Sequence, residues 1–118
     1  MIRKIMRFFL ASCLILSAFP SAASDTNGPH EIYGVYGTFN GALLFSTKSG
    51  NARSNLPACA STTSERWAID ASTPAGQAAA AVLLTAWTQH KRVWVTGKGV
   101  CTIWGDTETI EHFLVEDD

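Results

Sequence analysis

The sequence predicts one small, mainly β domain with a single helix, which is an α+β fold. Two patterns point to it: five segments have the composition or alternation of strands, and one alanine-rich segment follows a helix-start signal. The chain has 118 residues, of which 47% are hydrophobic and 16% are charged. This composition is typical of one packed globular domain and not of a disordered chain.

The N-terminal region has the pattern of a bacterial Sec-type signal peptide. Basic residues occur within positions 1–7, an apolar run covers 8–19, and small residues follow at 21–23. The apolar run is too short for a stable transmembrane helix. We therefore expect a signal peptide over 1–23 and one mature domain over 24–118. That domain would have no integral membrane segment and would be periplasmic or secreted.

A second interpretation of this region is a lipid anchor. The tetrad Leu10-Ala11-Ser12-Cys13 has the form of a bacterial lipobox, in which the cysteine would be lipidated. The apolar run continues beyond Cys13, however, and the apolar segment of a signal peptide precedes the cut. The sequence therefore favours ordinary secretion.

Apart from Cys13, the chain contains two cysteines, Cys59 and Cys101. Export would deliver them to an oxidising compartment, where an even number of cysteines predicts a disulfide bond. Two isolated cysteines without nearby histidines are too few ligands for zinc. We therefore expect a Cys59–Cys101 disulfide.

The mature domain would be acidic. Three of the nine basic residues precede residue 24. The domain over 24–118 therefore contains six basic and ten acidic residues, for a formal charge of −4. Proteins that bind phosphate backbones carry clustered Lys and Arg. We therefore expect no nucleic-acid partner.

The first half of the domain predicts three strands. Residues 31–39 alternate, and Asn40-Gly41 is typical of a two-residue hairpin turn leading into a partner strand over 42–47. Residues 48–64 have the composition of a long loop, and residues 24–29 that of a loose arm. The third strand covers 65–70, with Trp67 and Ile69 on one face.

Ser72-Thr73-Pro74 is a helix-start signal, a hydroxyl cap followed by proline, and the helix is expected to reach about His90. Its apolar arc is wide, which predicts cover on two sides, either by the long loop or by another subunit. The fourth strand follows at 92–96 and continues extended over 100–104 after a bulge or bend at 97–99, and the last strand covers 108–115.

The resulting order is strand, strand, strand, helix, strand, strand. This is the order of the OB-fold, a five-stranded Greek-key barrel in which the helix plugs one end. A plain α+β sandwich is the alternative that strand counting leaves open.

Between residues 45 and 104 the sequence has a further pattern of residues at characteristic spacing: Phe45, Lys48, Pro57, Ala58-Cys59-Ala60, Trp67-Ala68, the helix, Val93 and Ile103-Trp104. In this pattern the chain resembles the B subunits of bacterial toxins built from one A subunit and a B pentamer, such as subtilase cytotoxin and typhoid toxin. The resemblance implies an OB-fold, a homopentameric ring whose helices line a channel, and binding of sialylated glycans near the first strand. The first strand lies outside the matched range, so no sugar-binding residue is carried over.

Three aromatic residues are our candidate ligand-binding residues. Tyr33 and Tyr36 fall on opposite faces of an alternating strand, so at least one is expected to be accessible to solvent. Trp94 is flanked by two inward valines and is expected on the outer face of the barrel. Exposed Tyr and Trp can stack on sugar rings, and they serve protein interfaces equally well. Each ring taken singly fits a core or subunit contact as well.

The sequence lacks the motifs of an enzyme. Its three histidines show no metal-binding spacing, and no nucleophile elbow or phosphate-binding loop occurs. Asp106, Glu108 and His112 could converge on a metal, but Glu108, Ile110 and His112 alternate as on a half-exposed strand. We expect no catalytic residue, metal or cofactor.

The sequence thus predicts a secreted, non-enzymatic binding module similar to a toxin B subunit, which binds host glycans or a protein as a ring oligomer. The alternative is a stand-alone periplasmic or secreted OB-fold protein, without a toxin partner, that binds a protein or small ligand.

Overall fold

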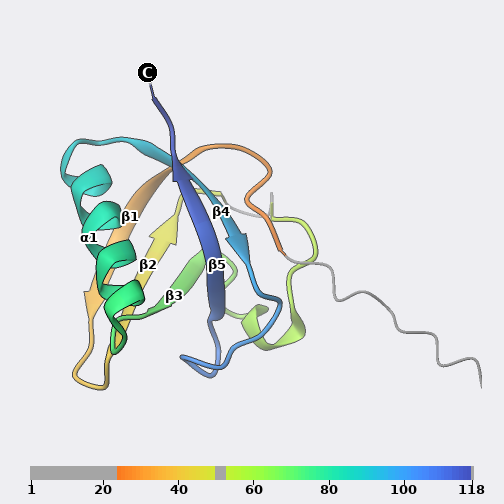
Figure 1. The fold of residues 1–118 in the computed structure, drawn as a ribbon. Helices are drawn as coiled ribbons and strands as arrows, with labels where there is room; N and C mark the ends of the chain where they lie inside the picture. The colour runs from red at the N-terminus through yellow and green to blue at the C-terminus, as the bar shows by residue number, and fades with distance from the viewer. Residues whose placement is uncertain (1–23, 50–52, 118) are drawn as a thin grey trace, which may run out of the picture.

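A computed structural model describes residues 24–49 and 53–117 (Figure 1). The predicted signal peptide over 1–23 lies outside the described residues. These described residues contain five strands, one helix and a short 3₁₀ turn at Ala58–Ala60. In chain order the elements are β1 (His30–Gly37), β2 (Ala42–Thr47), β3 (Arg66–Asp70), α1 (Pro74–Thr88), β4 (Arg92–Gly97) and β5 (Glu108–Val115).

The strands are hydrogen-bonded in the order β1-β2-β3-β5-β4, and pairing of His30 with Val93 and of Glu31 with Arg92 joins β1 to β4, closing the sheet into a barrel. All neighbours are antiparallel except β3 and β5, which run parallel, so the order is not that of a plain Greek key. The predicted class, mainly β with one helix between the third and fourth strands, is confirmed.

The core lies between the barrel and the inner face of α1. Phe45 of β2 is paired with Trp67 of β3, and both are fully buried with Val93 and Val95 of β4 and Leu83 of α1. Because successive side chains of a strand point to opposite faces, the neighbours of Phe45 and Trp67 lie on the outer face of the barrel, where Leu44 and Ala68 are buried in a second, smaller apolar cluster. That outer face of β1, β2 and β3 contains the candidate site.

The helix begins where the sequence predicts. The Thr73 hydroxyl oxygen accepts a hydrogen bond from the Gly76 N–H at 3.0 Å, and Pro74 occupies the first helical position. The helix ends at Thr88, two residues before His90, whose φ of 56° is not helical. The predicted end at about His90 is therefore close to the observed one.

Three local expectations are wrong. The β1–β2 connection is longer than a two-residue turn, since β1 ends at Gly37 and β2 begins at Ala42. Within it, the Thr38 hydroxyl donates to the Ala42 carbonyl oxygen at 2.6 Å and accepts from the Ala42 N–H at 3.2 Å. Residues 100–104 do not form a strand; Trp104 makes only an isolated bridge with Thr107.

The third wrong expectation is the loose arm predicted at 24–29. Ser24 and Thr26 are fully buried, the Thr26 N–H donates to the Val95 carbonyl at 3.1 Å, and the Ser24 carbonyl accepts from the Gly97 N–H at 2.8 Å. The segment therefore lies as an ordered strip along β4.

The predicted Cys59–Cys101 disulfide is present, with the two Cα atoms 6.2 Å apart. It joins the loop that precedes β3 to the segment that follows β4. Within residues 24–49 and 53–117 there is no helix long and apolar enough to cross a membrane.

Candidate functional site

A β-bulge in β1 places both tyrosines on one face. Tyr33 is paired with Ser46 of β2, and Tyr36 with Leu44, so three steps along β1 match two along β2. Such an extra residue shifts the alternation of side chains. The expectation that Tyr33 and Tyr36 fall on opposite faces is therefore wrong: they share the outer face, and both are exposed, by 37% and 50%.

Gly34 makes this bulge possible. Its φ is +60°, in the left-handed region that favours glycine, and a Cβ atom at this position would lie 3.3 Å from the Tyr36 hydroxyl. The Tyr36 ring thus folds back over a position that has no side chain.

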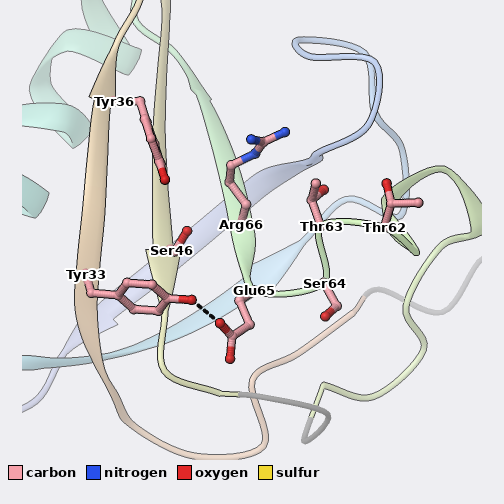
Figure 2. A pocket seen from close by; sticks show the side chains of 8 residues that line it. All are labelled: Tyr33, Tyr36, Ser46, Thr62, Thr63, Ser64, Glu65 and Arg66. Atoms are coloured by element: carbon pink, nitrogen blue, oxygen red, sulfur yellow. Dashed lines mark hydrogen bonds between the residues drawn. The ribbon is translucent and has the colours of Figure 1, made fainter.

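The two tyrosines border a pocket of about 350 Å³, which is within the range of small-molecule sites. Figure 2 shows its lining, which comes from β1, β2 and the chain leading into β3. Six of the lining residues carry hydroxyl groups and two are charged: Tyr33, Tyr36, Ser46, Thr62, Thr63, Ser64, Glu65 and Arg66. We call this the tyrosine pocket.

The floor of the tyrosine pocket is a cross-strand row. Tyr33, Ser46 and Arg66 lie side by side on β1, β2 and β3. The Arg66 side chain is fixed from behind, because Nη2 lies 2.6 Å from the Asp106 carboxylate and Nε donates to the Thr107 hydroxyl at 2.8 Å. Three strands therefore form the floor, and the segment before β5 holds Arg66 in position.

Glu65 and Tyr33 form the polar side of the pocket. The Tyr33 hydroxyl donates a hydrogen bond to the Glu65 carboxylate (Figure 2). This hydrogen bond raises the pKa of Tyr33 above its usual value, since losing the proton would place two negative charges together. The ordinary tyrosine pKa of 10.0 already keeps this hydroxyl a neutral donor at physiological pH, and the upward shift acts in the same direction.

A buried ion pair, which sequence reasoning missed, supports the wall of the pocket. The Arg53 guanidinium is paired with Glu108 and lies over the Trp67 ring, 3.6 Å from its centroid. It also donates to the Ser64 carbonyl. Burial lowers the pKa of Arg53, and the Glu108 carboxylate opposes this shift. Arg53 thereby ties a pocket residue to the core.

No local sequence signal identifies this ion pair. Glu108 was expected on a half-exposed strand face with Ile110 and His112, and this expectation is wrong because Glu108 is fully buried. Arg53 lies in a loop, 55 residues from its partner. Only the fold brings the two together.

Trp94, the third candidate, lies on the outer face of β4 as expected, with Val93 and Val95 inward and 42% of its surface exposed. It does not line the tyrosine pocket. Its cross-strand neighbour is Leu114 of β5, which is 62% exposed. The structure therefore separates the three aromatic candidates into a tyrosine pair and a Trp94–Leu114 pair.

An apolar groove of about 590 Å³ runs between α1 and β5. Val82 of α1, which is 52% exposed, lines it together with Leu114 and Phe113. The wide apolar arc predicted for the helix thus consists of an inner face on the core and an outer face on this groove. The described residues of the long loop, 48–49 and 53–64, do not line the groove.

The acidic and histidine residues considered for a metal do not converge. Glu108 is paired with Arg53, Asp106 is paired with Arg66, and His112 lies exposed on β5 opposite Thr96. Among the residues that the structure describes, no three His, Cys, Asp or Glu side chains gather where they could hold a metal ion.

Comparison of the chain with family models, with curated proteins and with solved structures finds no match.

Proposed function

We propose that this chain is an exported, non-enzymatic binding module with an OB-type barrel, similar to a toxin B subunit, that binds glycans through the tyrosine pocket. The observation that carries the proposal is the pairing of two exposed tyrosines with a carboxylate and several hydroxyl groups in one pocket. The barrel order, with β3 and β5 parallel, supports the OB-type assignment.

The chemistry of the pocket suits a sugar. A pyranose presents apolar C–H faces, which can stack on an aromatic ring, and hydroxyl groups, which exchange hydrogen bonds with hydroxyls and carboxylates. Tyr36 offers its half-exposed ring, and Glu65 and Ser46 offer oxygen atoms within the same pocket. Both kinds of contact are therefore available to one ligand.

Export is supported by the disulfide and by the leader pattern of residues 1–23. A Cys59–Cys101 bond is stable in oxidising compartments such as the periplasm or the extracellular space. We propose that the mature chain begins at Ser24 and acts in the periplasm or outside the cell, without a cofactor.

Assembly into a ring is supported by the outer face of α1. The helix contains no charged residue, whereas a solvent-facing helix usually carries several. Its exposed side, around Ala78 and Val82, adjoins the groove that Leu114 borders. We propose that this surface packs against a second copy of the chain, and that repetition of the contact closes a ring, as a homopentamer would. Light scattering of the purified mature protein tests the ring, because a clean monomer at micromolar concentration would refute it.

Binding is tested on a glycan array with the mature protein and two variants. Tyr36→Ala removes the stacking ring and should abolish binding, whereas Trp94→Ala removes an exposed ring outside the pocket and should leave it unchanged. Absence of binding by the wild-type protein to any glycan would overturn the proposal and favour the alternative, a stand-alone protein that binds a protein or small ligand.

A protein partner is the second candidate ligand, and one observation favours it. Trp94 and Leu114 form an exposed apolar pair on β4 and β5, and Trp is enriched at protein interfaces. This candidate predicts that the wild-type protein binds no glycan on the array. It also predicts that, in a pull-down with the protein partner, Trp94→Ala impairs capture and Tyr36→Ala leaves it intact.

A further inference from the structure

We infer that a second pocket continues the tyrosine pocket past Tyr33, and that the ligand is an oligosaccharide with one sugar at Tyr36 and a neighbouring sugar stacked on Trp87; this inference rests on the proposed glycan binding. The juxtaposition that carries it is Tyr33, which lines both pockets. The second pocket, of about 290 Å³, lies between β1 and the C-terminal end of α1. We call it the tryptophan pocket, and its lining includes Glu31, Tyr33, Gly34, Lys48, Trp87 and His90.

The two pockets adjoin each other at Tyr33. On the side of the tyrosine pocket, the Tyr33 ring extends from β1 toward Glu65, and its hydroxyl donates to that carboxylate (Figure 2). Gly34, the next residue of β1, lines the tryptophan pocket and not the tyrosine pocket. A row of linked sugars that passes Tyr33 therefore has a pocket on each side of it.

The feature of the tryptophan pocket that suits a sugar ring is Trp87. It lies in the last turn of α1, and 41% of the residue is exposed. The chain reverses directly after it, because the His90 N–H donates to the Trp87 carbonyl at 3.1 Å and His90 has a φ of 56°, a left-handed conformation that is uncommon outside glycine. This reversal returns His90 to the pocket that Trp87 lines. An exposed indole offers an apolar face for stacking and an N–H that donates hydrogen bonds.

An exposed ion pair supplies the polar side of the tryptophan pocket. The Lys48 ammonium lies 2.7 Å from the Glu31 carboxylate, and both side chains are more than half exposed. The Lys48 backbone N–H also donates to the Glu31 carbonyl at 3.0 Å, which holds the two residues together. An ammonium has three donor hydrogens and a carboxylate about four acceptor positions, so the pair can exchange further hydrogen bonds with sugar hydroxyls. An aromatic wall with a few polar groups is typical of a ligand site.

The tryptophan pocket is distinct from the surface proposed for ring assembly. The groove between α1 and β5, bordered by Val82 and Leu114, shares no lining residue with it. A contact between copies at that groove therefore does not by itself cover Trp87.

The experiment uses the mature protein and an array of glycan series of increasing length, such as galactose, lactose and sialyllactose, or N-acetylglucosamine with its dimer and trimer. The series that binds, or the shortened fragments of any other glycan that binds, is then titrated by calorimetry. The wild-type protein should bind the longest member about tenfold or more tightly than the shortest, the gain expected when a second aromatic ring is engaged.

Trp87→Ala should bind the longest member about tenfold more weakly than the wild-type protein and should bind the shortest member equally well. The matched control is Trp94→Ala, the same change at a tryptophan that is 42% exposed and lines neither pocket, and it should leave both affinities unchanged. The indole N–H signal of Trp87 in two-dimensional NMR, assigned by its absence from Trp87→Phe, gives a readout in the wild-type protein. It should move with the longest member and not with the shortest.

Three results would overturn the inference while leaving glycan binding in the tyrosine pocket standing. These are an affinity that does not rise with glycan length, a Trp87→Ala variant that binds the longest member as the wild-type protein does, and an indole signal of Trp87 that does not move. Binding to no glycan on the array would instead overturn the proposed function, and the inference with it.

Discussion

Arg53 and Glu108, 55 residues apart in the sequence, form an ion pair whose side chains are almost completely withdrawn from water. Glu108 also accepts a hydrogen bond from the Gly99 N–H at 2.9 Å, and Arg53 donates to the Ser24 hydroxyl at 2.8 Å and to the Ser64 carbonyl. One pair of side chains thus connects the N-terminal strip, the loop before β3, the segment after β4 and the start of β5.

Removing one member of this pair should destabilise the fold strongly. Arg53→Met leaves the Glu108 carboxylate buried without its cation, and losses from breaking a buried pair are about 3–5 kcal/mol. Urea denaturation of the two proteins measures the difference in the free energy of unfolding. The exposed pair of Lys48 and Glu31 supplies the control, because Lys48→Met should change that free energy little. An equally small change for Arg53→Met would contradict the structural role given to the buried pair.

The disulfide should account for a large share of the stability. Its 42-residue separation corresponds to about 4 kcal/mol in the chain-entropy treatment of loop closure. The double variant Cys59→Ser, Cys101→Ser should lose roughly this free energy of unfolding. Intact mass before and after reduction provides the companion measurement, since reduction should add two hydrogen atoms. A mass unaffected by reductant would show that the bond is absent.

A side chain at Gly34 should disrupt the tyrosine pocket. Gly34→Ala would place a Cβ atom 3.3 Å from the Tyr36 hydroxyl, at a φ of +60°, where an L-residue costs about 1–2 kcal/mol. We expect weaker glycan binding together with lower thermal stability. Gly37→Ala is the control on the same strand, since nothing lies within 4 Å of a Cβ atom there. Equal glycan binding by both variants would argue against a bulge that shapes the site.

Acid should remove a contribution from Asp70. Its pKa is lowered from 3.8 because it accepts hydrogen bonds from the side chain and backbone of Ser72, just before α1. A lowered pKa in the folded state stabilises the fold above the unfolded value, and this stabilisation is lost as the pH falls through the folded pKa. Asp70→Asn should therefore flatten the decline in melting temperature between about pH 5 and 2, and Ser72→Ala should flatten it in part. Identical declines in all three proteins would contradict this assignment.

Those parts of the fold that depend on neighbouring residues were predictable from the sequence. Thr73-Pro74 fixes the start of α1 through a local hydrogen bond. Alternation identifies β3 to within one residue at its start and β5 with the bounds that the structure shows. The cysteine pair was predictable because Cys59 and Cys101 are the two cysteines that follow the predicted signal peptide, so only one intramolecular pairing was available to them. The irregular path of 100–104 was not, because the disulfide at Cys101 and the bridge of Trp104 override the extended propensity of that segment.

The candidate site was predictable only in its residues. The sequence identifies Tyr33 and Tyr36 as candidates, but their common face depends on the register with β2, which a single strand does not encode. Glu65 and Ser46 join them from other strands and loops, and Arg53 acts through a contact made only in the folded chain. Trp94 was placed correctly on the outside because the burial of Val93 and Val95 follows simple alternation.

Chemical-shift mapping by two-dimensional NMR, as the mature protein is titrated with a glycan selected on the array, tests most directly whether sugars bind between the two tyrosines. Our account predicts that the largest amide shifts cluster at Tyr33, Tyr36, Ser46 and Glu65 and vanish in Tyr36→Ala. Shifts centred instead on Trp94 and Leu114, or shifts that persist when Tyr36 is replaced, would contradict it.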